Sequence, residues 1–346
     1  ESPFCPILFP SMGRSRFILF IGLILLGTSL AANLLFLSKE TKIIPKTHFV
    51  HPAPVFEEEL VEGDDSQKKR IAKIELYGLI AQEIPGEIGS SMVDDLILQI
   101  RQAAYDDSVA ALVVHIDSPG GEVTASDILY RELALTREDK PGIVYMDSVA
   151  ASGGYYTAVG GSHLVAHDLC VTGSIGVILQ TLNFEGLSKI VGVSALTFKS
   201  GALKDLLNPT RPATEQEKKL VQDMIQETFD RFSSIVAKER GFDTGQLPGD
   251  LADGRIVSGQ KALELKLVDA TGYLDDAYAD ARQIAKLPED APIIRYVAPF
   301  HWSRLFRFLG QKGESSTKVQ ISLFPESFRL QAGKLYYLST HLFSRR

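Results

Sequence analysis

The chain has 346 residues, of which 45% are hydrophobic and 23% are charged, and its formal net charge at pH 7 is −7. These values are ordinary for a globular protein with one large domain or two modest ones, so composition alone names no function. The acidic balance argues against a nucleic-acid partner.

The first element expected along the chain is a membrane span over residues 17–37. This stretch carries no charge, and its length is close to the roughly 20 apolar residues that cross a hydrocarbon core. A cleaved secretory signal is the alternative, with Ser29-Leu30-Ala31 as a candidate cleavage site. We favour a single-pass anchor, because apolar residues 34–37 continue beyond that site. The short segment before it, residues 1–16, is expected inside the cytoplasm and the remaining chain outside.

Neither cysteines nor histidines indicate a metal or disulfide framework. Cys5 and Cys170 fall on opposite sides of the expected span, so they cannot pair within one chain. The seven histidines show no ligand spacing, and only His163 and His167 lie four apart, in a segment typical of a strand and turn. We expect no metal and no cofactor.

Beyond the span, residues 38–70 contain three prolines and short charged runs without an apolar period, which predicts a juxtamembrane linker. Strand-like and helix-like segments then alternate, which predicts an α/β fold with a mainly parallel sheet and right-handed crossovers. Strands are expected over 71–80, 111–116, 142–146 and near 176–179, and helices over 92–104, 123–135 and from Ser152.

A long amphipathic helix follows, opened by the capping-box pattern Thr214-Glu-Gln-Glu217 and ending before Gly241. Its apolar positions predict a core or subunit-contact stripe: Leu220, Met224, Ile225, Phe229, Phe232 and Ile235. We assign the main folded domain to residues 71–290 and a basic, aromatic tail to residues 291–346. The tail is expected either to contact anionic lipid headgroups or to be partly disordered or docked on the core.

Two glycine-flanked turns carry the chemistry. Asp117-Ser-Pro-Gly-Gly121 follows an apolar strand, and Ser152-Gly-Gly154 opens a helix. If the turns meet, the amides of Gly153 and of Gly121 or Gly120 converge as an oxyanion hole beside the Ser152 hydroxyl. Lys199 lies in a similar small-residue setting and supplies a base without histidine, so the pattern predicts a serine–lysine peptidase.

Six motifs in order resemble the signal peptide peptidase A (SppA, protease IV) family over about residues 71–286. They are Asp117-Ser-Pro-Gly-Gly121, Ala151-Ser-Gly-Gly-Tyr-Tyr156, Thr172-Gly-Ser-Ile-Gly-Val177, Lys199-Ser-Gly201, Asp253-Gly-Arg255 and Leu267-Val-Asp269. The resemblance implies a ClpP/crotonase-like fold of stacked βα and ββα units, with Ser152 as nucleophile, Lys199 as general base and Ser174 orienting the lysine. Longer family members carry two such repeats, whereas one is found here. A homo-oligomer with active sites near subunit boundaries is therefore expected.

The competing base is Lys204. We favour Lys199, because it matches the family motif and because Lys204, beside Asp205, would more readily form a solvated ion pair. A lysine is a base only when neutral, which burial or positive neighbours favour.

Other titratable residues receive structural roles. We expect Asp117 and Asp147 to hold turn backbone, and His115 and His163 to be structural rather than members of a Ser-His-Asp triad.

The sequence thus predicts an endopeptidase anchored in a bacterial cytoplasmic membrane, with an extracytoplasmic catalytic domain. It would degrade cleaved signal peptides and other hydrophobic peptides, bound in extended form. Two alternatives are a membrane scaffold that retains the fold, and acyl-CoA chemistry on the same fold.

Overall fold

The computed structural model describes residues 56–82, 91–242, 247–248, 251–298 and 335–338, together with Ser29. The chain divides into two compact units, Glu1–His51 and Pro52–Arg346, and every helix and strand given below belongs to the second. Apart from Ser29, the expected span over residues 17–37 lies outside the described residues. None of the helices in the described ranges is long and apolar enough to cross a membrane.

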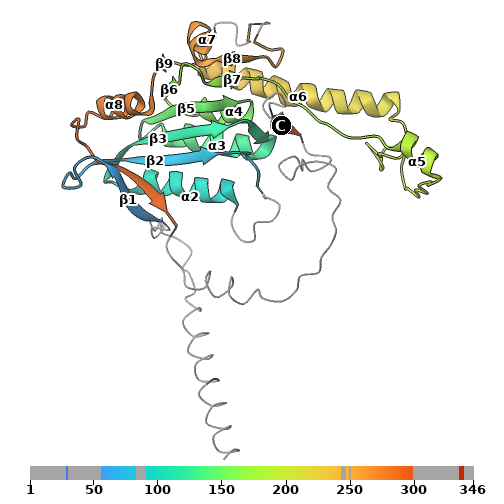
Figure 1. Cartoon of the computed structure of the whole chain (residues 1–346), viewed down its shortest axis with the longest axis horizontal. Coiled ribbons are helices and arrows are strands. Elements are labelled where there is room, and N and C mark those ends of the chain that lie inside the picture. The colour runs from blue at the N-terminus through green and yellow to red at the C-terminus, as the bar shows by residue number, and fades with distance from the viewer. Residues whose placement is uncertain are drawn as a thin grey trace, which may run out of the picture. The chain divides into compact units, whose positions relative to one another are not determined.

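A nine-stranded sheet forms the centre of the second unit (Figure 1). Its main path runs β1-β10-β2-β3-β5-β6-β9, with β7 paired to β5 and β8 paired to β7. All pairs of neighbouring strands in the sheet are parallel except two, β1 with β10 and β7 with β8. The strands are β1 (Glu57–Glu62), β2 (Arg70–Tyr77), β3 (Val109–Ser118), β5 (Gly142–Ala151), β6 (His163–Ala166), β7 (Val171–Gly173), β8 (Ile256–Ser258), β9 (Ala270–Thr271) and β10 (Ile293–Val297). The mainly parallel α/β architecture is therefore confirmed.

Helices cover both faces of the sheet, which explains why residues 109–114 of β3 are all apolar. Leu112 and Val114 point to the larger core, with helices α2 (Met92–Tyr105), α3 (Val123–Thr136) and α4 (Gly153–Ala158). Ala111 and Val113 point to the smaller core, which includes helix α8 (Leu274–Ile284). The remaining helices are α5 (Glu185–Val191), α6 (Glu215–Glu239) and α7 (Gly259–Glu264).

The long helix α6 joins the core by one end. Its capping box is present, with Thr214 as the N-cap and Glu217 at the third helical position, as the sequence predicts. Phe232 is completely buried, whereas Leu220 and Met224 in the first half are exposed. The predicted stripe thus divides into a core end and an exposed end. Figure 1 shows α5 beside the exposed end of α6, away from the sheet.

The structure differs from the sequence expectations about the elements at three places. The strand expected near residues 176–179 is instead β7, which ends at Gly173, although Ile178 makes an isolated bridge to Tyr336. The segment expected to be a linker contains β1, which pairs antiparallel with β10, with Glu57 opposite Val297 and Glu62 opposite Ile293. The segment assigned to the tail contains β10 and also β11 (Tyr336–Leu338), which pairs with β4 (Gly120–Glu122) in agreement with the docked alternative.

Candidate active site

Ser152 occupies the sharp turn between β5 and α4. Its backbone has φ 54° and ψ −115°, a conformation that non-glycine residues rarely adopt. The side chain is 1% exposed, and its Oγ has no hydrogen-bond partner among the described residues. A strained backbone and a buried, unpartnered hydroxyl are both unfavourable for folding alone, and such features concentrate at functional sites.

The two glycine turns meet at this serine, as the sequence predicts. A Cβ added to Gly120, whose φ is 101°, would lie 2.6 Å from the Gly153 nitrogen. A Cβ added to Gly153 would lie 3.0 Å from the Gly121 nitrogen. The amide of Gly120 donates instead to Ser118 Oγ at 3.1 Å. Gly121 and Gly153 are therefore better candidates than Gly120 for the oxyanion donors.

The end of the chain lies across these glycines. Strand β11 pairs antiparallel with β4, with Tyr337 opposite Gly121. On its other side, the Tyr336 backbone exchanges two hydrogen bonds with Ile178, of 3.1 and 3.2 Å. The Tyr337 carbonyl oxygen lies 3.1 Å from the position of a Cβ added to Gly153. An extended segment of the protein itself therefore occupies the groove beside Ser152.

The Tyr337 side chain fills an aromatic pocket. It is completely buried and stacks on Tyr156, with ring centroids 4.9 Å apart, and lies 4.6 Å from the ring of Phe232 on α6. Its hydroxyl donates to the Thr228 carbonyl at 3.2 Å. Residues from α4 and α6 thus form a pocket that accepts a large apolar side chain.

Ser174 lies close to the same groove, but Lys199 contacts Asp205 and Ala202 rather than Ser174. Its φ is 51°, and its amide donates to the Arg255 carbonyl at 2.7 Å. It lines a cavity of about 400 Å³ together with Ile178, Phe229 and Asp253, among others. Because Ile178 pairs with Tyr336, this cavity borders the tail strand.

Lys199 is not brought to Ser152 within the described chain. It lies in the loop between α5 and α6, where its Nζ contacts Asp205 Oδ1 at 2.6 Å and donates to the Ala202 carbonyl at 2.9 Å. The expectation that Lys204 would form the ion pair with Asp205 is wrong. The loop turns back on itself between residues 201 and 208, which brings Asp205 under Lys199.

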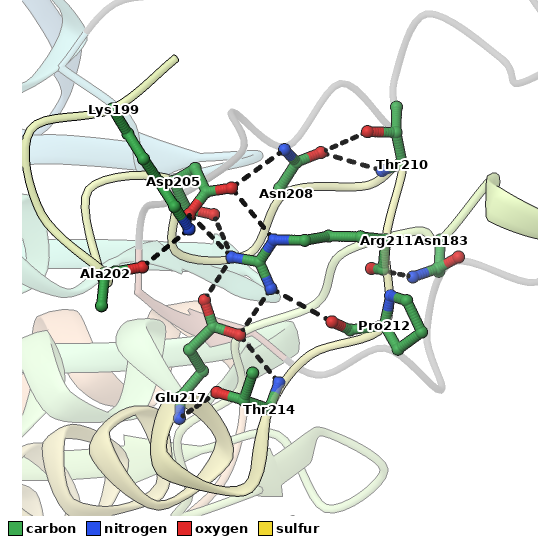
Figure 2. A network of polar contacts seen from close by, with 10 residues as sticks. All are labelled: Asn183, Lys199, Ala202, Asp205, Asn208, Thr210, Arg211, Pro212, Thr214 and Glu217. Carbon is green, nitrogen blue, oxygen red and sulfur yellow. Dashed lines mark hydrogen bonds and ion pairs between the residues drawn. The ribbon is translucent and has the colours of Figure 1, made fainter. Parts of the chain in front are cut away.

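A polar network anchors this loop to α6 (Figure 2). Arg211 contacts both Asp205 and Glu217, whose carboxylates it approaches to 2.8 and 2.5 Å. Hydrogen bonds from Arg211 and then Lys199 hold the pKa of Asp205 well below its usual range. Arg211 likewise lowers the pKa of Glu217 to about 2. Sequence reasoning missed this network, because nothing in a lone arginine between two prolines indicates which acids it meets.

The other acids and histidines considered from the sequence have partners away from Ser152. His115 contacts Asp147 at 3.0 Å and Tyr77 at 2.9 Å. Asp117 accepts the amide of Val149 at 3.0 Å, which is the turn-holding role expected for it.

Two further candidates for chemistry also lie elsewhere. His163 contacts Asp280 at 3.2 Å. Burial raises the pKa of the Cys170 thiol to about 12, so it is not a competing nucleophile. In the described parts of the chain, no group of three or more His, Cys, Asp or Glu residues is arranged to hold a metal ion.

Comparison with known proteins shows the family of the chain. Residues 134–288 match the model of peptidase family S49. A protein of Enterococcus faecium, provisionally named signal peptide peptidase SppA, is 34% identical over 281 residues, which cover 78% of this chain and 80% of that protein. Protease 4 of Salmonella typhi is 34% identical over 209 residues, or 60% of this chain and 33% of that protein.

The chain therefore belongs to peptidase family S49 and is a serine-type peptidase. Among solved structures, a ClpP1 mutant from Listeria monocytogenes matches 59% of this chain and 93% of its own. The identity is 15% and the TM-score 0.39, a similarity too low to argue from.

Proposed function

We propose that the chain is an endopeptidase that cleaves hydrophobic peptides, remnant signal peptides in particular, with Ser152 as nucleophile and Lys199 as general base. The observation that carries this proposal is the buried Ser152 hydroxyl, unpartnered on a strained turn beside Gly121 and Gly153. Neither a scaffold nor an acyl-CoA enzyme would explain a buried serine hydroxyl without a hydrogen-bond partner at this position.

The reaction follows from the roles of these groups. Ser152 Oγ attacks the peptide carbonyl carbon while its proton passes to the neutral amine of Lys199. The amides of Gly121 and Gly153 bind the developing oxyanion, and a single such donor typically contributes about 3 kcal/mol to lowering the barrier. The C–N bond breaks as Lys199 returns the proton to the leaving amine, and water then hydrolyses the acyl-enzyme by the reverse proton path.

The tail strand supports an extended mode of substrate binding. It lies antiparallel to β4 and beside Ile178, with one aromatic side chain inserted between α4 and α6. A peptide that replaced it would gain the same main-chain hydrogen bonds, and pockets for alternate side chains would provide selectivity. The apolar lining of the pocket favours hydrophobic substrates.

We infer that the dyad is completed between copies of the chain, as sequence reasoning anticipates for the single-repeat form. Lys199 lies in the segment that follows α5. Helix α5 and this segment expose several large apolar side chains, among them Ile190 (83%), Leu196 (81%) and Phe198 (88%). Exposed apolar surface of this kind is typical of an interaction site. A head-to-tail contact that presented this segment to the next copy would form a ring where the rotation between copies closes.

The membrane anchor over residues 17–37 and the extracytoplasmic position of the catalytic domain remain part of this proposal. An anchor of this kind would hold the site close to the bilayer, where cleaved signal peptides remain after export. Ser174 is proposed to orient the Lys199 amine of the neighbouring copy, since it lies beside the groove.

The test compares the full chain in detergent with three variants, by mass spectrometry of the products of a signal-peptide-like substrate. We expect Ser152→Ala and Lys199→Ala to abolish cleavage and Lys204→Ala to retain it. Cleavage by Ser152→Ala would refute the nucleophile, and no cleavage by the assembled parent would favour a scaffold.

A further inference from the structure

Arg211 stands between the Lys199 loop and α6 with every nitrogen of its guanidinium engaged. Its Nε and Nη2 donate to the two carboxylate oxygens of Asp205, at 2.9 and 2.8 Å. Its Nη1 and Nη2 donate to the two carboxylate oxygens of Glu217, at 2.8 and 2.5 Å. Figure 2 shows this double fork, with Lys199 on the far side of Asp205.

Glu217 holds the Arg211 guanidinium in a fixed position. Its side chain is 1% exposed and belongs to the capping box of α6, where it accepts the Thr214 amide at 2.8 Å. The Arg211 backbone is held as well, because Asn183 donates to its carbonyl at 2.7 Å. The guanidinium therefore ties Asp205, and the loop that carries it, to the first turn of a long helix.

Lys199 and Arg211 share one acceptor. Asp205 Oδ1 is 2.6 Å from Lys199 Nζ and 2.8 Å from Arg211 Nη2. Asn208 also donates to this carboxylate, at 3.3 Å. The charged groups that face one another here are thus Lys199, Arg211, Asp205 and Glu217. Arginine stays protonated and binds a carboxylate through two bonds, so it keeps Asp205 when the lysine leaves.

We propose that Arg211 is the positioning residue of the catalytic lysine: it holds the Asp205 carboxylate against α6, so that Lys199 can leave it and act as a neutral base. This inference rests on the proposed function of Lys199. Without the guanidinium, Lys199 would be the remaining cation of Asp205, and an ammonium held by an uncompensated carboxylate keeps its proton.

The first readout is the pH profile of kcat for the full chain. Relative to the parent, Arg211→Met is expected to lower kcat about tenfold near neutral pH and to move the acidic limb of the profile up by about one pH unit. Adding Asp205→Asn to that variant removes the competing charge and is expected to return the limb to its original position. A merely structural arginine would lower kcat without moving the limb.

The second readout does not require proteolysis. In chains that carry Ser152→Ala, Lys199 is acetylated with acetic anhydride, and its labelling is compared by mass spectrometry with that of Lys204 in the same loop. Arg211→Met is expected to lower the Lys199-to-Lys204 ratio about tenfold, and Asp205→Asn to restore it, because only the neutral amine reacts. An unchanged ratio would overturn the proposal.

Two further variants keep the result interpretable. Arg101→Met removes a similar fork, since Arg101 donates to the two oxygens of Glu132 at 2.9 and 2.6 Å between α2 and α3. It is expected to change neither readout, and an equal effect would overturn the assignment. Arg211→Lys keeps the positive charge but loses the paired hydrogen bonds to Asp205. It is expected to lower kcat and to leave the acidic limb of the pH profile at its parental position. A limb displaced as far as in Arg211→Met would contradict the claim that the charge of Arg211 compensates Asp205. Cleavage surviving Ser152→Ala would instead refute the proposed function, independently of the labelling ratio.

Discussion

Replacing Tyr337 by alanine is expected to open the groove to added peptides. The side chain is completely buried, stacks on Tyr156 at an interplanar angle of 22°, and contacts the ring of Phe232. Its backbone lies opposite Gly121, where a substrate strand is proposed to lie. We therefore expect the tail to compete with added peptides for the site.

The expected effect follows from the burial of this one ring. Truncating a buried aromatic side chain to alanine typically costs about 3–5 kcal/mol. At the lower end, about 3 kcal/mol weakens docking of the tail roughly 100-fold. A competitor tethered to the same chain raises the apparent KM of an added peptide, so Tyr337→Ala should lower KM by up to about 100-fold and leave kcat unchanged.

The assay is steady-state cleavage of a fluorogenic hydrophobic peptide by the intact oligomer. Tyr337→Phe removes only the hydroxyl that donates to Thr228 and should give a small decrease in KM. Tyr105→Ala is the matched control, because that ring is 50% exposed and lies on α2. An unchanged or higher KM in folded Tyr337→Ala would show that the tail does not compete with substrate.

Three other predictions follow from the structure. Gly153→Ala should lower kcat by about 100-fold, because the added Cβ lies 3.0 Å from the Gly121 nitrogen. Gly142→Ala is the control and should leave kcat unchanged, because its Cβ meets nothing within 4 Å. Equal losses of kcat in the two variants would refute the oxyanion assignment. Ile190→Asp should abolish assembly and cleavage together without changing the circular dichroism of the chain. An active assembly, measured by light scattering, would contradict an interface made by the exposed side chains of Ile190, Leu196 and Phe198. Because Arg211 lowers the pKa of Glu217 from 4.5 to about 2, their pair stabilises the folded chain above about pH 5 and loses this contribution as the pH falls toward 2. The Tm difference between the parent and Arg211→Met should therefore shrink over that range, and a constant difference would argue against the pair.

The sequence predicted the parts of the fold that depend on local pattern. The apolar run of β3 indicated a strand covered on both faces, and Thr214 with Glu217 marked the start of α6. The meeting of the two glycine turns was also predictable, because both follow neighbouring parallel strands at the same edge of the sheet. Gly120 and Gly153 have no room for a side chain, which agrees with that prediction.

What the sequence did not predict depends on contacts between distant residues. The pairing of β11 with β4 joins residues more than 200 positions apart, and Tyr337 is one of several aromatic residues in a basic tail. The partner of Asp205 was predicted from adjacency to be Lys204, but the folded loop presents Lys199 instead. Sequence spacing does not specify which side of a loop each side chain occupies.

Mixing two inactive variants is the most direct test of a dyad shared between copies. Ser152→Ala and Lys199→Ala chains would be dissociated, mixed in equal amounts and reassembled, and each would be assayed alone as a control. If Ser152 of one copy works with Lys199 of the next, random mixing restores about a quarter of the parental activity. No recovery in a properly assembled mixture would contradict a site completed by the neighbouring copy.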